Sequence, residues 1–236
     1  EFCDEVVVSV FVNPLQFEDQ DDLAKYPKTP EIDAQLAREA GATILWRPDY
    51  ETIYPNEIPR LFSGELGKKF EGVHRPGHFD GVLTVVNRFF ELVRPRYAIF
   101  GEKDFQQLFL IKAMAKTLHP DIEIIAAPTI RESSGLAMSS RNVRLSDTGK
   151  AEANLIHHAL TAANHQDSIA IAREKLNHQL ESKNFKLDYA EIIDSDTFAT
   201  ATEESRNLRA IVAGWIEGIR LIDNAEVKLS RTLVKS

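Results

Sequence analysis

The chain has 236 residues, of which 43% are hydrophobic and 27% are charged, a composition typical of one large or two modest globular domains and not of a disordered chain. Lys and Arg number 28 against 36 Asp and Glu, and the net charge of −8 argues against nucleic acid or an anionic membrane as a partner. The single cysteine, Cys3, excludes an internal disulfide framework and a cysteine-based zinc site, and it favours a reducing compartment. No apolar run approaches the roughly 20 residues that a membrane span needs.

Short apolar runs alternate with amphipathic segments in the first half of the chain. Strands are predicted at residues 6–12, 43–46, 97–100 and 122–126, and the first is expected to be buried on both faces because it lacks polar alternation. Helices are predicted at residues 31–40, 82–93 and 105–118. This alternation predicts an α/β fold with a parallel sheet, in which ligands bind at the carboxyl ends of strands.

The second half has a different character. Residues 129–142 are polar and rich in Ser and Gly, as a linker or a mobile loop would be. Helices are predicted at residues 147–163 and 169–181, and strands at 187–193, 208–216 and 220–222. Helices followed by strands predict a small α+β domain.

Several common motifs are missing from this sequence. No G-x-G-x-x-G, Walker P-loop or H-E-x-x-H pattern occurs. A nucleotide site, if the chain has one, must therefore be built in another way.

The segment GEKDFQQ, residues 101–107, follows a predicted strand and opens a predicted helix. Gly101 allows a ligand to approach the backbone, Lys103 adds a cation near a helix N-terminus, and Asp104 can accept from sugar hydroxyls. The structural alternative is a capped helix with Asp104 as its N-cap.

Three further segments have both a functional and a structural interpretation. GLAMSSRN, residues 135–142, offers hydroxyls and an arginine for phosphate, or is a polar linker. FVNPLQF, residues 11–17, offers Asn13 and Gln16 to a small polar substrate, or is a turn after a strand. In RPGHFDG, residues 75–81, His78 is a phosphate donor or general acid, or it satisfies the backbone of a loop.

In this order, the segments FVNPLQF, RPGHFDGV, GEKDFQQ and GLAMSSRN resemble the pantothenate synthetase (pantoate–β-alanine ligase) family. The resemblance extends from about Val6 to the C-terminal IRLIDN. It implies a Rossmann-like domain of the HIGH-motif nucleotidyltransferase type at residues 1–129, which binds ATP and pantoate, and a smaller C-terminal lid domain at residues 130–236. It further implies a cytoplasmic homodimer.

The activity implied is the ATP- and Mg²⁺-dependent condensation of (R)-pantoate with β-alanine through pantoyl adenylate, which releases pyrophosphate and AMP and makes a coenzyme A precursor. By motif, Lys103 and Arg141 correspond to catalytic residues, and Gln16, Gln107 and Asn13 to pantoate-binding residues. The residues that correspond to ATP-binding positions are Gly101, Glu102, Lys103, Asp104, Ile130, Met138, Ser139, Ser140 and Arg141, while the metal ligands stay unknown.

The family also has an M-x-x-L-H-x-G-H segment upstream of its FVNP strand, with two histidines that bind phosphates and one that serves as proton donor. The 236 residues contain no H-x-G-H. We therefore expect the chain to resemble an N-terminally truncated member that makes little pantothenate by itself. Two alternatives stay open, an adenylyltransferase with another acceptor and a non-catalytic nucleotide-binding or assembly protein.

Overall fold

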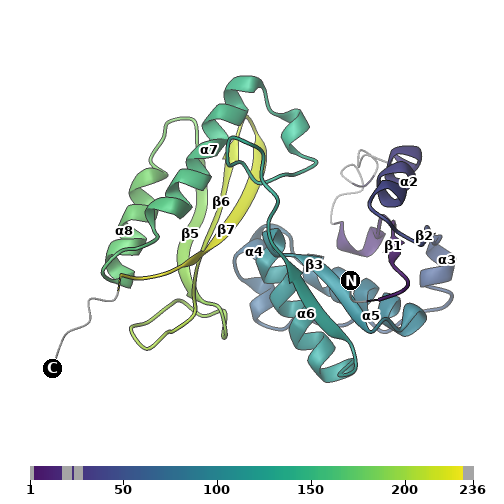
Figure 1. Ribbon diagram of the computed structural model, residues 1–236. Coiled ribbons are helices and arrows are strands. Elements are labelled where there is room, and N and C mark those ends of the chain that lie inside the picture. Colours follow the sequence, from purple (N-terminus) through teal and green to yellow (C-terminus); the bar gives the residue numbers. More distant parts are fainter. Residues whose placement is uncertain (1–2, 18–22, 24–28, 231–236) are drawn as a thin grey trace. The chain divides into compact units, whose positions relative to one another are not determined.

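The computed structural model describes residues 3–17, 23 and 29–230 (Figure 1). It divides into two compact units, Glu1–Tyr97 with Leu110–Glu123, and Ala98–Phe109 with Ile124–Ser236. These units interleave along the chain, so the domain boundary expected between residues 129 and 130 stays a prediction. No helix of the described part is long and apolar enough to cross a membrane.

The first unit is built on a short parallel strand pair surrounded by helices. β1 (Val7–Ser9) pairs with β2 (Ile44–Trp46), with Val8 opposite Leu45, which confirms the predicted parallel pairing. The other elements are η1 (Pro14–Gln16), α2 (Pro30–Glu39), α3 (Tyr50–Ile53), η2 (Leu66–Lys68), α4 (Glu71–His74) and α5 (His78–Val93).

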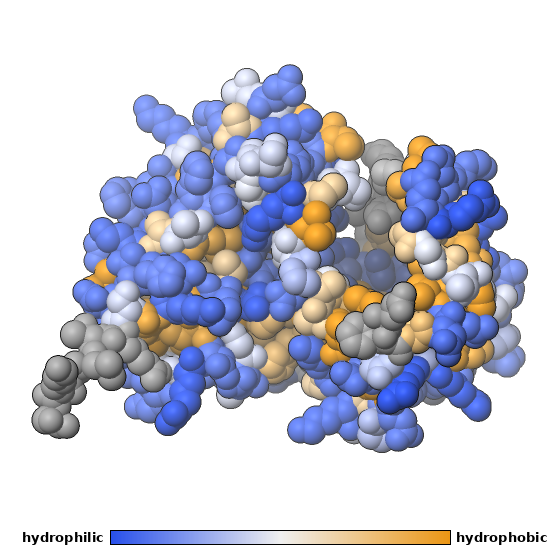
Figure 2. All heavy atoms as spheres, in the orientation of Figure 1, coloured by the Kyte–Doolittle hydropathy of each residue, from blue (hydrophilic) through white to orange (hydrophobic). Residues whose placement is uncertain are grey.

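The expectation that the first strand is buried on both faces is wrong. Val6 and Val7 are 42% and 37% exposed. Among the described residues, β2 is the strand that pairs with β1, so no strand lies along the other edge of β1. Hydrophobic side chains accordingly reach the surface around β1 and β2, whereas most of the face seen in Figure 2 is hydrophilic.

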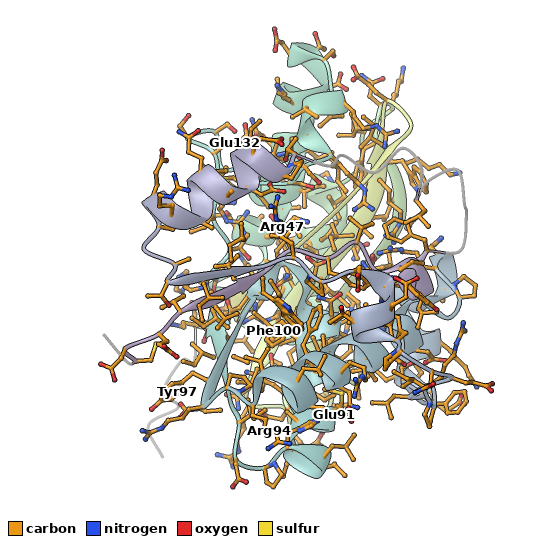
Figure 3. The ribbon with its side chains drawn as sticks, turned by 90° about the vertical axis from the view of Figure 1, so that its right-hand side faces the viewer. Arg47, Glu91, Arg94, Tyr97, Phe100 and Glu132 are labelled. Carbon is orange, nitrogen blue, oxygen red and sulfur yellow. The ribbon has the colours of Figure 1, made fainter. Side chains whose placement is uncertain are left out.

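Helix α5 begins four residues earlier than the apolar pattern predicts. Gly77 adopts the left-handed conformation at its N-cap (φ 74°), and Asp80 in the first turn accepts bonds from the main-chain N and the hydroxyl of Ser63 at 2.8 and 2.6 Å. Polar residues therefore serve the first turn of a helix whose later turns are apolar. The helix ends at Arg94, also left-handed (φ 49°), whose Nε donates to the carbonyl of Glu91 (Figure 3).

The second unit contains most of β3 and a three-stranded antiparallel sheet with two helices. β3 (Tyr97–Gly101) forms a two-stranded sheet with β4 (Glu123–Ala127), and η3 (Glu102–Asp104) and α6 (Phe105–Leu118) lie between them in sequence. After η4 (Asn142–Arg144) come α7 (Asp147–Ala162), α8 (Ile169–Gln179), β5 (Lys186–Asp194), β6 (Leu208–Ile216) and β7 (Ile219–Val227). The α/β class and the small C-terminal antiparallel domain are thus as predicted.

The core of this unit lies where α7 and α8 pack on the sheet, with Ile156, Leu160, Leu176, Ile192 and Val212 among its buried side chains. Ser146 caps α7 by accepting from the amide of Gly149 at 2.9 Å. The Glu217 carboxylate, at the β6–β7 turn, accepts from the main-chain N and the hydroxyl of Ser146. The β6–β7 hairpin and the start of α7 are therefore joined by two hydrogen bonds between Glu217 and Ser146.

Strand β7 is longer than the predicted residues 220–222. It continues through Val227 because Asp223 and Asn224, which interrupt the apolar pattern, are buried and hydrogen-bonded. The local sequence pattern does not predict two buried polar residues inside this sheet.

Candidate active site

The turn after β1 is held by Asn13, which is only 2% exposed. Its Nδ2 donates to the carbonyl of Gly81 at 3.0 Å and lies 3.4 Å from Oε1 of Gln16, while its Oδ1 accepts from Leu15 N and from the hydroxyl of Tyr54 at 3.2 and 3.0 Å. Burial raises the pKa of Tyr54, so this hydroxyl stays a donor. The contacts of Asn13 fit the structural interpretation of a turn that fixes Gln16, and a direct role toward pantoate stays a prediction.

His78 is also engaged with this turn. Arg75 Nη1 lies 3.0 Å from Nε2 of His78, and Nδ1 lies 3.0 Å from the carbonyl oxygen of Gln16. A guanidinium only donates, so Nε2 accepts and the ring proton belongs on Nδ1, which donates to Gln16. These contacts favour the backbone-satisfying interpretation of His78 over a general acid.

The glycine of RPGHFDG explains how helix and turn approach so closely. A Cβ atom at Gly81 would lie 2.2 Å from the carbonyl oxygen of Leu15. Any other residue would therefore push α5 away from η1. The segment RPGHFDG therefore has a structural role, because its Gly81 carbonyl binds Asn13 and its His78 ring binds the carbonyl of Gln16.

The segment that follows β3 belongs to the second unit. Gly101 ends the strand, Glu102–Asp104 form the 3₁₀ turn η3, and α6 begins at Phe105. Lys103 is half-buried and Asp104 is exposed. Within the described residues, no carboxylate forms an ion pair with the Lys103 ammonium. Gln107 lies on the first turn of α6 and is half-buried, while Gln16 belongs to the first unit.

The expected linker at residues 129–142 is an ordered hairpin followed by a turn. Met138 N donates to the carbonyl of Ile130 at 2.9 Å, and the main chains of Arg131 and Ala137 form an antiparallel β-bridge. The chain turns at Gly135, which has a positive φ of 96°. The side chains of Ile130 and Met138 are exposed at the open end of this hairpin. An ordered hairpin that leaves two large apolar side chains in solvent fits the functional interpretation better than a linker.

Asn142, which closes this segment, is structural. Its buried Nδ2 donates to Oε1 of Glu132 (labelled in Figure 3) and to the carbonyl of Ala137 at 2.9 and 3.1 Å. The preceding Ser139 hydroxyl accepts from Arg141 N at 3.2 Å, so these residues form a tight turn. Ser140 and Arg141 are exposed on it, and their role toward ATP stays a prediction.

Two residues that contact the candidate site segments were missed by reasoning from local patterns, Asp223 and Asn224 of the IRLIDN sequence. They are 5% and 4% exposed and make hydrogen bonds to Arg131 and to the main chain of Glu102 and Lys103. The available signal was two adjacent polar residues in an apolar strand. No group of three or more His, Cys, Asp or Glu side chains that could hold a metal ion occurs among the described residues.

Comparison with known proteins places these segments in a family. The sequence profile of pantoate-beta-alanine ligase matches residues 1–226. The pantothenate synthetase of Cytophaga hutchinsonii is 42% identical over 94% of this chain and 82% of its own length. That of Pseudomonas savastanoi pv. phaseolicola is 40% identical over 97% of this chain and 83% of its own.

Solved structures agree with the sequence comparison. The pantothenate synthetase of Thermus thermophilus has a TM-score of 0.88 and 41% identity over 94% of this chain and 83% of that chain. The pantoate-beta-alanine ligase of Francisella tularensis, complexed with beta-gamma ATP and beta-alanine, has a TM-score of 0.74 and 34% identity over 94% of this chain and 79% of that chain. The fold and the site segments thus define an α/β ligase. The chain belongs to the pantoate–β-alanine ligase family, and its relatives from Cytophaga, Pseudomonas and Thermus are called pantothenate synthetases.

Proposed function

We propose that this chain carries out the ATP-dependent condensation of (R)-pantoate with β-alanine. In the first step, a pantoate carboxylate oxygen attacks the α-phosphorus of ATP, the bond to the β-phosphate oxygen breaks, and pyrophosphate leaves. In the second step, the β-alanine amine attacks the acyl carbon of pantoyl adenylate, the bond to the AMP oxygen breaks, and the amine loses a proton. The products are pantothenate, AMP and pyrophosphate.

The residues of the second unit supply the charge that the first step needs. Lys103 and Arg141 stabilise negative charge that grows on the transferring phosphate. Gly101, Glu102 and Asp104 line the nucleotide, with Asp104 at the ribose, and the backbone of Ile130 meets the adenine. Met138, Ser139 and Ser140 belong with Arg141 to the second ATP-binding segment, whose two hydroxyls donate to phosphate oxygens. Gln16 and Gln107 bind pantoate, with Asn13 beside Gln16.

Mg²⁺ enters this proposal with ATP. In nucleotide sites Mg²⁺ keeps several waters and is held by one or two carboxylates together with the substrate phosphates. The exposed Asp104, next to Lys103, has the ligand chemistry that such an ion prefers.

The observation that carries the proposal is that the Lys103 ammonium has no ion-pair partner among the described residues. This cation stands two residues after the glycine that ends β3, and no carboxylate of the described residues forms an ion pair with it. The chain also belongs to a family of ligases. A cation kept unpaired beside an accessible backbone is suited to a phosphate.

The decisive test is exchange of labelled pyrophosphate into ATP, followed by AMP release on addition of β-alanine. We expect exchange to require pantoate. Exchange that proceeds equally with other acids would favour an adenylyltransferase with another acceptor, and calorimetric binding of ATP without exchange would favour a non-catalytic protein. The assay is run on the 236-residue chain and on the same chain preceded by an M-x-x-L-H-x-G-H segment, which tests whether the exchange needs those two histidines.

The pantoate residues are tested in the same assay. Replacing Gln16 or Gln107 with Ala removes one donor from a desolvated substrate, and we expect kcat/KM for pantoate to fall by about 5- to 150-fold while ATP binding is retained. Gln35→Ala, on the exposed face of α2, is the matched control. Equal loss of ATP affinity would move these glutamines to the nucleotide or to a structural role. The homodimer and the cytoplasmic location implied by the resemblance also stay proposals, the first checked by light scattering.

A further inference from the structure

The IRLIDN sequence belongs to the resemblance but has no role in the proposed reaction. In the structure it lies on β7, and its last two residues, Asp223 and Asn224, are buried polar side chains. Burying such groups is costly unless they are hydrogen-bonded. Their partners therefore indicate what the motif is for.

Asn224 binds the main chain of residues 102–103, in the first segment proposed to bind ATP. Its Nδ2 donates to the carbonyl oxygens of Glu102 and Lys103, both at 2.9 Å, and its Oδ1 accepts from Nη1 of Arg209 at 2.6 Å. Because a guanidinium cannot accept, the orientation of the amide is fixed, with both N–H groups toward the two carbonyls. The side-chain amide is thus fully used, and it fixes the backbone at the residue that carries the candidate catalytic ammonium.

Asp223, the neighbouring residue, binds the hairpin that leads to the second segment proposed to bind ATP, residues 138–141. Its two carboxylate oxygens accept from Nη1 and Nη2 of Arg131 at 2.6 and 3.0 Å, and Nη1 of Arg131 also donates to the carbonyl of Gly135 at 3.0 Å. Arg131 lies on the hairpin that leads to Met138. The main-chain N of Asn224 donates to Oδ1 of Asp223 at 2.8 Å, which links the two anchors.

Arg209 completes the arrangement from β6. Its Cζ lies 4.0 Å from the centroid of the Phe105 ring, and its Nη2 lies 3.6 Å from Oε1 of Glu102. It therefore contacts the start of α6, the side chain of Glu102 and the amide oxygen of Asn224 at once.

We propose that Asn224 is a positioning residue of the ATP site, which sets the conformation of the Glu102–Lys103 main chain so that the Lys103 ammonium meets the transferring phosphate. The adjacent Asp223–Arg131 pair holds the hairpin before Met138 on the same strand. This inference rests on the proposed function, because it assigns Asn224 a task only if Lys103 acts on ATP. Asn224 itself does not touch the substrate in this proposal.

The substitution Asn224→Asp separates positioning from bulk. It keeps the size of the side chain and the acceptor for Arg209, but it replaces the two N–H donors with an oxygen that faces two carbonyl oxygens. The turn at Glu102–Lys103 must then shift, and a small displacement of a preorganised group has a large effect on rate. We expect kcat/KM for ATP in the exchange assay to fall by about 10- to 100-fold.

The matched control is Asn164→Asp. Asn164 also donates through Nδ2 to a carbonyl of β7, that of Glu226 at 3.3 Å, and its Oδ1 accepts from Lys228 N at 2.8 Å. None of its contacts reaches Glu102 or Lys103. We expect this variant to lose stability without a change in kcat/KM for ATP. Equal losses of activity in the two variants would overturn the proposal.

A double-mutant cycle with Lys103→Ala distinguishes positioning of Lys103 from general damage. If Asn224 acts through Lys103, Asn224→Asp lowers the residual activity of the Lys103→Ala protein by less than about twofold, whereas a general structural defect lowers it as much as in the wild type. Additive losses would overturn the proposal. Urea unfolding of every variant is measured alongside.

A second variant covers the case in which Asn224→Asp does not fold. Asn224→Ser retains one hydroxyl donor, and we expect an intermediate loss that again disappears in the Lys103→Ala background. Wild-type activity in Asn224→Ser would overturn the proposal. Failure of the proposed function is a separate result, since the wild-type protein would then show no pantoate-dependent exchange.

Discussion

Lys103 differs from the nearby Arg131 and Arg209 in having no carboxylate partner among the described residues. Arg131 is paired with Asp223 at 2.6 Å, and Arg209 lies 3.6 Å from the Glu102 carboxylate. Both arginines therefore have carboxylate partners within the second unit. At the residue scale, the proposed chemistry therefore depends on Lys103 and on the exposed Arg141.

Replacing Lys103 with Ala should lower pantoate-dependent pyrophosphate exchange by about 10²- to 10³-fold, by analogy with the removal of one preorganised donor from a transition state. The loss is expected in kcat, because the charge on the phosphate grows during the reaction. Lys116→Ala, an exposed lysine on the same helix that begins after Lys103, is the control. Retention of more than half of the wild-type rate would remove Lys103 from the mechanism.

At the scale of elements, two glycines stand at junctions for opposite reasons. Gly81 is required by the protein itself, since its Cβ would lie 2.2 Å from the carbonyl oxygen of Leu15. Gly101, at φ −70° and ψ 138°, adopts a backbone conformation open to any residue, and nothing lies within 4 Å of where its Cβ would be. The described structure thus gives no internal reason for glycine at position 101. A ligand that approaches the backbone would be such a reason.

We therefore expect Gly81→Ala and Gly101→Ala to have different consequences. Gly81→Ala should destabilise the protein by about 1–3 kcal/mol, because α5 must move away from η1. Gly101→Ala should keep the free energy of unfolding and weaken ATP binding. Urea unfolding and ATP titration calorimetry on both variants measure this contrast. Unchanged ATP affinity in Gly101→Ala would show that the nucleotide does not approach this backbone.

The same scale shows how far local patterns reach. The bounds of α6 and β6 were predicted to the residue, because their apolar spacing and the flanking polar turns are local signals. The extent of β7 was not predicted, since burial of Asp223 depends on Arg131, 92 residues away, and that of Asn224 on Lys103, 121 residues away. Candidate segments of the site were found from their motifs, whereas the bonds that hold them were not visible in the sequence.

At the scale of the whole molecule, His157 links stability to pH. It lies on α7, half-buried, and a Cβ at Gly135 would come within 2.3 Å of its ring. Burial lowers the pKa of His157 below its usual 6.5, and the neighbouring Arg131 and His158 lower it further, against the opposing effect of Asp223. The folded protein therefore favours the neutral ring.

This shift predicts a loss of stability in mild acid. Below an unfolded-state pKa of 6.5 the unfolded chain binds a proton that the folded chain resists, so the contribution is fully present above that pH and falls as the pH decreases. Urea midpoints of the wild type and of His157→Gln are compared at about pH 7.5 and about pH 5.5. We expect a smaller difference between the two pH values in His157→Gln. An identical difference would mean that other groups control the acid response.

The turn between β6 and β7 has a consequence for how the sequence tolerates changes of length. It consists of Glu217 and Gly218, both with positive φ, and it sets the pairing of Ile216 with Ile219 and of Ile211 with Asn224. Side chains alternate between the faces of a strand, so one residue inserted at this turn would place Asp223 where Asn224 now lies. A carboxylate would then face the carbonyls of Glu102 and Lys103. An insertion in this exposed turn would thus have the same effect at Glu102 and Lys103 as the substitution Asn224→Asp, because it shifts the register of every later residue of β7.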